Sequence, residues 1–223
     1  MTIKLYYAKF SPPVRAVLFN LKMLNIHHEL INVDVSKKEN KSEEYLKINP
    51  LGTVPTMIDN NFVIIDSHAI NKYLVNKYAK DDKLYPKDIN AQSVVDQRLF
   101  FDNGVLFTAL KNVMVKIVIE KTLTAVTSDI IRSFENTYGF LEKFLNSTSY
   151  IAGNHITIAD LSVITTLTTL DILVPVRIEK FPFVIAYIDR CKKTFPSYSE
   201  INEEGLNMIR QLLASFQFQL SAL

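Results

Sequence analysis

The apolar and polar residues of the first 80 positions alternate in some segments and recur every three or four positions in others. Strict alternation predicts a half-buried strand, and a period near 3.6 predicts an amphipathic helix. The elements predicted in this way are a strand at 3–8, a helix at about 13–24, a strand at 29–35, a helix at 42–48, strands at 54–58 and 62–65, and a helix at 67–78. This order predicts a small mixed sheet with helices on both faces.

The rest of the chain has only the helical period. Residues 80–88 (KDDKLYPKD) are charged, include Pro86 and follow neither period, which predicts a linker. Helices are predicted at about 89–119, 127–146, 157–172, 180–194 and 200–214. The predicted fold class is therefore an α/β domain over 1–80 followed by an all-α domain over 89–223.

Two segments carry clear signals for the start of a helix. Ser11 precedes Pro12 and Pro13, and proline fits the first helical turn because its missing N–H has no partner there. Thr157 is followed three residues later by Asp160, a variant capping box, and Ile156 before the cap suits a hydrophobic staple. Asp160 is interpreted as a folding residue.

Composition narrows the classes of function. The 223 residues carry a net charge of +2, too small to favour nucleic acid or an acidic membrane surface as partner. No apolar run has the length of a membrane helix, and the first ten residues lack the features of a signal peptide. The scattered histidines predict no metal site. A single cysteine, Cys191, excludes an internal disulfide and favours a reducing, cytoplasmic setting.

Five segments together resemble the cytosolic glutathione S-transferases. They are SPPVRAVL (11–18), NPLGTVPTM (49–57), DSHAI (66–70), FFDNGVLF (100–107) and AGNHITIADLS (152–162). SPPVR, DSHAI and GVLF are most similar to the insect epsilon class, with the delta class as its near neighbour. DLSVITTLTTL (160–170) and SFQF (215–218) further resemble its noppera-bo-like members, which are associated with ecdysteroid production. The resemblance implies a thioredoxin-like N-terminal domain that binds glutathione and a helical domain that supplies a hydrophobic acceptor site.

The resemblance gives Ser11 a catalytic role, since a serine at this position in the family donates a hydrogen bond to the glutathione sulfur. A free thiol has a pKa of about 8.5 and is mostly protonated at neutral pH. The N-terminus of a helix favours an anion, and a hydroxyl donor stabilises the thiolate further. The alternative is that Ser11 only caps the helix.

The resemblance also implies the residues that hold the rest of glutathione. A cis peptide before Pro55 presents the Val54 backbone, beside Thr53, to the cysteinyl part of the ligand, although a trans proline on an edge strand is the alternative. Asp66 and Ser67 suit the γ-glutamyl ammonium and carboxylate, or form an ordinary helix cap. His68 either lines this site or lies on the helix surface. The implied glutathione-binding set is Asn40, Thr53, Val54, Pro55, Asp66, Ser67 and His68.

The chain departs from the epsilon pattern at three positions. Asn40 and Gly52 stand where histidines usually contact the glycyl end of glutathione. Asn40 can still donate a hydrogen bond, but Gly52 has no side chain. Leu110 stands where noppera-bo-like members carry an acidic residue for a steroid hydroxyl. Two outcomes are open for the glycyl end: either the affinity for glutathione is lower, or Lys41 or another basic residue reaches the glycyl carboxylate. Leu110 weakens the expectation of steroid recognition.

The second substrate is expected between the two domains, in a site with apolar walls. The expected acceptor residues are Phe10, Pro13, Phe107, Leu110, Lys111, Met114, Leu206 and Phe216. Each of them is equally consistent with a place in the core between the domains. For Lys111 the alternatives are a solvated lysine and a cation that steers an anionic acceptor or stabilises developing negative charge.

The function implied is a glutathione transferase that conjugates glutathione to hydrophobic electrophiles and works as a homodimer through the helices that start at about 67 and 89. Two alternatives remain. The first is a protein that binds steroids or other hydrophobic ligands with little turnover and acts in ecdysteroid biosynthesis. The second is a structural relative without glutathione, such as a lens or translation-factor domain.

Overall fold

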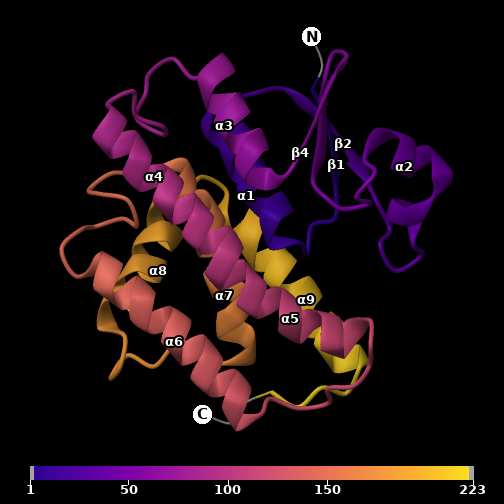
Figure 1. The fold of residues 1–223 in the computed structure, drawn as a ribbon, viewed down its shortest axis with the longest axis vertical. Coiled ribbons are helices and arrows are strands. Elements are labelled where there is room, and N and C mark those ends of the chain that lie inside the picture. Colours follow the sequence, from indigo (N-terminus) through magenta and orange to yellow (C-terminus); the bar gives the residue numbers. More distant parts are fainter. Residues whose placement is uncertain (1–2, 221–223) are drawn as a thin grey trace.

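A computed structural model describes residues 3–220, and it has the two-part fold that the sequence predicts (Figure 1). The N-terminal elements are β1 (Ile3–Tyr7), α1 (Pro12–Met23), β2 (His28–Asn32), a 3₁₀ turn (Glu39–Lys41), α2 (Glu43–Ile48), β3 (Thr56–Asp59), β4 (Phe62–Ile65) and α3 (Ser67–Tyr78). The four strands lie in the order β2-β1-β3-β4. β1 and β2 are parallel, and β3 is antiparallel to both β1 and β4, which gives the predicted mixed sheet.

The second part is helical, as predicted. Its elements are α4 (Ile89–Phe101), a π-helical segment (Asp102–Leu106), α5 (Phe107–Val118), α6 (Ser128–Leu145), α7 (Ile158–Leu173), α8 (Pro182–Thr194), a second π-helical segment (Ser199–Glu203) and α9 (Glu204–Ser215). The single helix expected at 89–119 is therefore divided by a π-helical turn. Such turns accommodate an extra residue and occur often at functional sites. Within residues 3–220, none of the helices has the length and apolarity that crossing a membrane requires.

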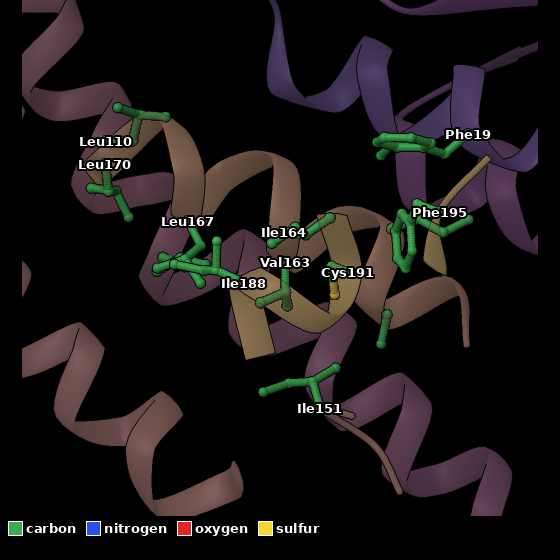
Figure 2. Packing of buried hydrophobic residues seen from close by; sticks show 14 of the residues in the cluster. Phe19, Leu110, Ile151, Val163, Ile164, Leu167, Leu170, Ile188, Cys191 and Phe195 are labelled. Carbon is green, nitrogen blue, oxygen red and sulfur yellow. The ribbon is translucent and has the colours of Figure 1, made fainter. Parts of the chain in front are cut away.

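α7 is the core of the helical part and lies at its centre in Figure 1. Every one of its 16 residues except Asp171 is buried. A helix that is buried on all sides must be surrounded by other elements. Figure 2 shows Val163, Ile164, Leu167 and Leu170 of α7 among neighbouring side chains such as Leu110 of α5.

α1 joins the two parts of the molecule. Phe19 of α1 is fully buried, and its ring lies 5.1 Å from the ring of Phe195 in an edge-to-face arrangement (Figure 2). Aromatic pairs of this geometry add to the stabilisation that comes from burial alone. The helix that begins beside Ser11 is therefore held by the sheet on one side and by the helical part on the other.

The helix-start signal at residue 157 corresponds to a dense hydrogen-bond cluster. The carboxylate of Asp160 accepts hydrogen bonds from the N–H groups of Ile151 and Thr157, both at 2.8 Å. It also accepts from the hydroxyls of Thr157 at 3.0 Å and Tyr187 at 3.1 Å. Burial raises the pKa of Asp160 to about 6 even though these hydrogen bonds favour the charged form. Asp160 therefore joins a loop, the start of α7 and α8 at one buried point.

Two strands begin or end differently from the sequence prediction. The strand expected at 29–35 ends at Asn32, because the carboxylate of Asp34 accepts hydrogen bonds from the N–H groups of Ser36 and Lys37 and starts a turn. The strand expected at 54–58 begins only at Thr56, after a cis peptide between Val54 and Pro55. In both places, residues 33–35 and 54–55, the chain is a loop where the sequence predicted a strand.

Candidate functional site

The hydroxyl of Ser11 is not used to cap α1. Ser11 is the N-cap residue by its backbone, and its carbonyl accepts from the N–H of Arg15 at 3.1 Å. Its side chain makes no capping hydrogen bond. Pro12 and Pro13 occupy the first two helical positions and offer no N–H, which removes one of the two donors that a capping hydroxyl usually finds. The hydroxyl is thus left available at the positive end of a helix.

Ser11 lines a cavity of about 650 Å³ between the two parts of the molecule. The cavity has walls from the start of α1, the turn after β2, α5, α7 and α9. Its lining residues are Phe10, Ser11, Pro12, Asp34, Val35, Ser36, Phe107, Leu110, Lys111, Met114, Val115, Val118, Ile119, Thr169, Met208, Ile209, Gln211 and Leu212. Most of these side chains are apolar, which suits a hydrophobic ligand held next to the Ser11 hydroxyl.

The structure brings five of the eight expected acceptor residues into this cavity. Phe10, Phe107, Leu110, Lys111 and Met114 line it together with Ser11. The other three do not line it. Leu206 is buried in the core, Phe216 packs against that core after the end of α9, and Pro13 lies in the first turn of α1. α9 contributes other residues to the wall, among them Met208 and Leu212.

The sequence reasoning did not select the remaining lining residues, although some of them carry a signal. Val115 and Val118 follow Lys111 at helical spacing on α5, and Met208 and Leu212 have the same spacing on α9. The same spacing also describes a core face, so it does not identify a cavity. The turn residues Asp34 to Ser36 have no such pattern, because only the early end of β2 places them there.

The loop before β3 has the backbone arrangement that the resemblance implies. The Val54–Pro55 peptide is cis. The carbonyl of Thr53 accepts hydrogen bonds from the hydroxyl of Tyr45 at 2.7 Å and from the amide of Asn49 at 2.8 Å. Among residues 3–220, the N–H and C=O of Val54 have no hydrogen-bond partner, so both are free to pair with an added peptide strand.

Asn40 and Lys41 both bind the loop at Gly52. The amide of Asn40 donates to the carbonyl of Gly52 at 2.8 Å, and the ammonium of Lys41 donates to the carbonyl of Leu51 at 3.0 Å. Gly52 has a φ of +59°, and a Cβ there would lie 2.6 Å from the ammonium nitrogen of Lys41. The lysine therefore fills the space that a side chain at position 52 would need.

Asp66 is the N-cap of α3 in a strained conformation, with a φ of 72°. One carboxylate oxygen accepts from the N–H groups of His68 at 2.9 Å and Ala69 at 3.2 Å. The imidazole of His68, more than the backbone N–H groups, lowers the pKa of Asp66, so the carboxylate is charged near neutral pH. Its side chain is 53% exposed, and Ser67 beside it is buried at the first helical position.

His68 is held between two carboxylates and does not lie on the helix surface. Its Nε2 is 3.0 Å from Asp102 and its Nδ1 is 3.6 Å from Asp66. Burial alone would lower the pKa of His68, but the two carboxylates outweigh it and raise the pKa to about 9. Asp102 starts the π-helical segment after α4, and the sequence reasoning did not identify it as part of the site. His68 therefore ties the start of α3 to the helical part.

Comparisons with known proteins agree with this geometry. Residues 5–82 match the family model of the glutathione S-transferase N-terminal domain, and residues 110–194 match that of the glutathione S-transferase C-terminal domain. The chain belongs to the glutathione S-transferase family. Membership makes it an enzyme of the glutathione transferase type. Glutathione is the co-substrate of this family, and residues 3–220 contain no group of side chains that could hold a metal ion.

Individual relatives of this glutathione S-transferase come from insects. Glutathione S-transferase 1 of Manduca sexta is 38% identical over 217 residues, which are 96% of this chain and 99% of that protein. An epsilon-class structure from the housefly, Musca domestica, has a TM-score of 0.94 and 42% identity over 98% of this chain and 100% of that one. A Drosophila mojavensis homolog with bound glutathione has a TM-score of 0.92 and 39% identity over 98% and 99% of the two chains.

The expected link to ecdysteroids receives no specific support from these relatives. Among the cavity-lining residues that the structure describes, Asp34 is the one carboxylate. Its oxygens are occupied by Ser36 and Lys37, which lower its pKa. Leu110, at the position expected to be acidic in that subgroup, is a buried apolar part of the wall. Within residues 3–220, the cavity thus offers a steroid hydroxyl no free carboxylate.

Proposed function

We propose that this transferase binds glutathione along the starts of α1 and α3 and adds it to an apolar electrophile in the cavity beside Ser11. The observation that carries the proposal is the Ser11 hydroxyl, which has no capping partner and lines an apolar cavity of about 650 Å³. The Val54 backbone pairs with the cysteinyl part of the peptide. Asp66 receives the γ-glutamyl ammonium, and Ser67 with the first N–H groups of α3 receives its carboxylate.

The chemistry follows from the placement of Ser11. The bound thiol releases its proton to solvent, and the thiolate that remains accepts a hydrogen bond from the Ser11 hydroxyl. The sulfur then forms a bond to an electrophilic carbon held by Phe10, Phe107 and Met114. In a substitution the leaving group, such as a halide, departs with the electron pair of the broken bond. Lys111 stabilises the negative charge that develops on such an acceptor.

The direct test is the rate of glutathione conjugation to a simple aryl halide between about pH 6 and pH 9. We expect a rate well above the uncatalysed background and an apparent thiol pKa below the ordinary value of about 8.5. Calorimetric binding of glutathione gives a second measurement. A protein that binds neither glutathione nor the aryl halide would contradict the proposal. Tight binding of hydrophobic ligands without conjugation would instead favour a binding protein.

We expect Lys41 to contact the glycyl carboxylate of glutathione. Its ammonium already lies at the loop where the family usually has a histidine. Replacing Lys41 by alanine should raise the KM for glutathione about fivefold, as expected for an exposed charge-assisted hydrogen bond, and leave kcat unchanged at saturation. Steady-state kinetics with glutathione as the varied substrate measure this. Lys47→Ala, an exposed lysine of α2, is the matched control, and equal KM values for the two variants would exclude the contact.

We propose that the protein is a homodimer that buries α3, α4 and β4. Phe100 and Ile89 of α4 are 75% and 68% exposed, and Phe62 of β4 is 50% exposed. α4 and α3 are connected by the ion pair between Lys72 and Asp96 at 3.1 Å, so these apolar residues belong to adjacent elements. Large exposed apolar side chains on neighbouring elements are typical of an interface between subunits.

Replacing Phe100 by aspartate should convert the dimer to a monomer, because the interface would have to bury an unpaired charge. Size-exclusion chromatography with light scattering measures the mass directly. Ile178→Asp is the control, since Ile178 is also an exposed apolar residue (58%) but lies outside these three elements. A wild-type protein of monomeric mass would exclude the dimer.

The reducing cytoplasm, where glutathione is kept as a thiol, is the compartment that the proposed function implies.

A further inference from the structure

Arg15 is a buried cation next to the site, and the function described so far does not use it. Its side chain is 0% exposed. It forms no ion pair with any carboxylate in residues 3–220, and its Nε has no hydrogen-bond partner. Burying a charge without a partner of opposite charge is costly, so most buried arginines are paired. Arg15 therefore needs a physical explanation.

The neighbours of the guanidinium are neutral polar groups. One terminal nitrogen donates to Asn202 Oδ1 at 2.5 Å, and the other donates to Thr169 Oγ1 at 2.6 Å. The carbonyls of Asn202 and Thr165 are both at 3.4 Å. Gly205 allows this close packing, because a Cβ there would lie 2.5 Å from Arg15 Cδ. The cation is thus fixed in one position at the junction of α1, α7 and the second π-helical segment.

Two contacts connect this cation to the catalytic cavity. Arg15 is one helical turn after Ser11, and its N–H donates to the Ser11 carbonyl at 3.1 Å. Thr169, which accepts from the guanidinium, lines the same cavity as Ser11. An anion at Ser11 would therefore share a helix start and a cavity wall with the groups that hold the guanidinium, and charges interact more strongly where protein replaces water between them.

Within residues 3–220, none of the other charged groups around Arg15 forms an ion pair with its guanidinium. On the α7 side, the guanidinium contacts only the neutral groups of Thr165 and Thr169. The second π-helical segment brings Glu203, and Tyr198 comes just before that segment; both favour the charged guanidinium without bonding to it. Glu204 is paired with Lys9, and Asp34 in the cavity is paired with Lys37. Within residues 3–220, Lys111 is the cation that lines the cavity, and Arg15 lies behind the wall. Burial lowers the pKa of Arg15 to about 9, which still leaves it charged near neutral pH.

We propose that Arg15 acts as a buried positioning charge whose missing counter-ion is the glutathione thiolate, and that its field lowers the pKa of the bound thiol in addition to the hydrogen bond from Ser11. The inference rests on the proposed function. Arg15 touches no substrate atom in this scheme, and acts through the electrostatic potential at the start of α1. A unit charge that acts over ~10 Å at an effective dielectric constant of ~20 shifts a pKa by about one unit.

Three substitutions separate the charge of Arg15 from its structural role. Arg15→Gln removes the charge and keeps hydrogen-bond donors. Arg15→Lys keeps the charge and loses the planar guanidinium with its several N–H donors. Asn202→Asp changes no volume and gives the guanidinium a carboxylate at the position of the present amide oxygen, so the pair has no net charge. This last variant should fold because it provides a buried cation with a counter-ion.

The measurement is the ultraviolet absorbance of the bound thiolate as a function of pH, with circular dichroism to confirm folding. We expect the thiol pKa to rise by about one unit in Arg15→Gln and Asn202→Asp and to stay within a few tenths of the wild-type value in Arg15→Lys. Below the thiol pKa, the two charge-neutral variants should conjugate about tenfold more slowly, with convergence toward wild type at high pH. KM for the acceptor should not change.

A wild-type protein that shows no thiolate below the pKa of free glutathione would contradict the proposed function itself. Suppose that the thiol pKa is lowered in the wild type and has the same value in Arg15→Gln and Asn202→Asp. That result would overturn only the role of Arg15. If Arg15→Gln does not fold, the titration of Asn202→Asp alone shows whether the charge of Arg15 lowers the thiol pKa. An equal rise in all three variants would show that the geometry of the guanidinium matters and its charge does not, which also overturns the proposal.

Discussion

Replacing Ser11 by alanine is expected to lower kcat/KM for aryl halide conjugation about 10- to 100-fold near pH 6.5, because a hydrogen bond to a charged group contributes about 1.5–3 kcal/mol. The hydroxyl has no capping partner in α1, so its loss should change catalysis more than folding. The same free energy corresponds to a rise of about one to two units in the thiol pKa. The rate profile of the variant should therefore approach that of wild type at high pH.

Parallel pH–rate profiles of wild type and Ser11→Ala give this result directly. Ser133→Ala, an exposed serine of α6, is the control for the substitution itself. Thermal unfolding of both variants shows whether stability has changed. If Ser11→Ala keeps the wild-type profile, then Ser11 serves only the backbone geometry at the start of α1, and the thiolate is stabilised by other groups.

Replacing Asp160 by alanine is expected to lower the free energy of unfolding by about 3–4 kcal/mol, since buried N–H groups left without an acceptor cost roughly 1–3 kcal/mol each. The N–H groups of Ile151 and Thr157 both lose their acceptor, and the hydroxyl of Tyr187 loses its partner. These groups connect a loop and α8 to the start of α7, the central helix of the helical part. The variant should consequently lose activity through unfolding at moderate temperature.

Chemical denaturation followed by circular dichroism measures this change. The matched control is Thr127→Ala, at the N-cap of α6, where an exposed hydroxyl accepts from the N–H of Ile130 at 3.4 Å. An exposed cap of this kind contributes about 1 kcal/mol or less. Similar losses in the two variants would show that Asp160 is an ordinary cap and that its contacts with Ile151 and Tyr187 add nothing.

The site was predictable where a residue type has a local reason for its position. Ser11 stands before two prolines, and Asp66 and Ser67 stand before a helix, so sequence alone indicates helix starts that favour an anion. Phe107, Leu110, Lys111 and Met114 follow from the resemblance together with the helical period of α5. Leu206 shows the limit of this reasoning, because neighbouring residues of one helix face either the core or the cavity, and the rotation of α9 decides which.

The sequence by itself determined the elements, their division into an α/β and an all-α part, and the family, because hydrophobic period, proline and capping residues act within a few positions of the chain. Only the tertiary structure decided which distant groups meet. His68 lies between Asp66 and Asp102, Lys41 fills the space beside Gly52, and Arg15 is buried against Thr169 and Asn202. These contacts join residues up to 187 positions apart. Their energies depend on burial and on the absence of water between them, and neither property is written in the local pattern of a sequence.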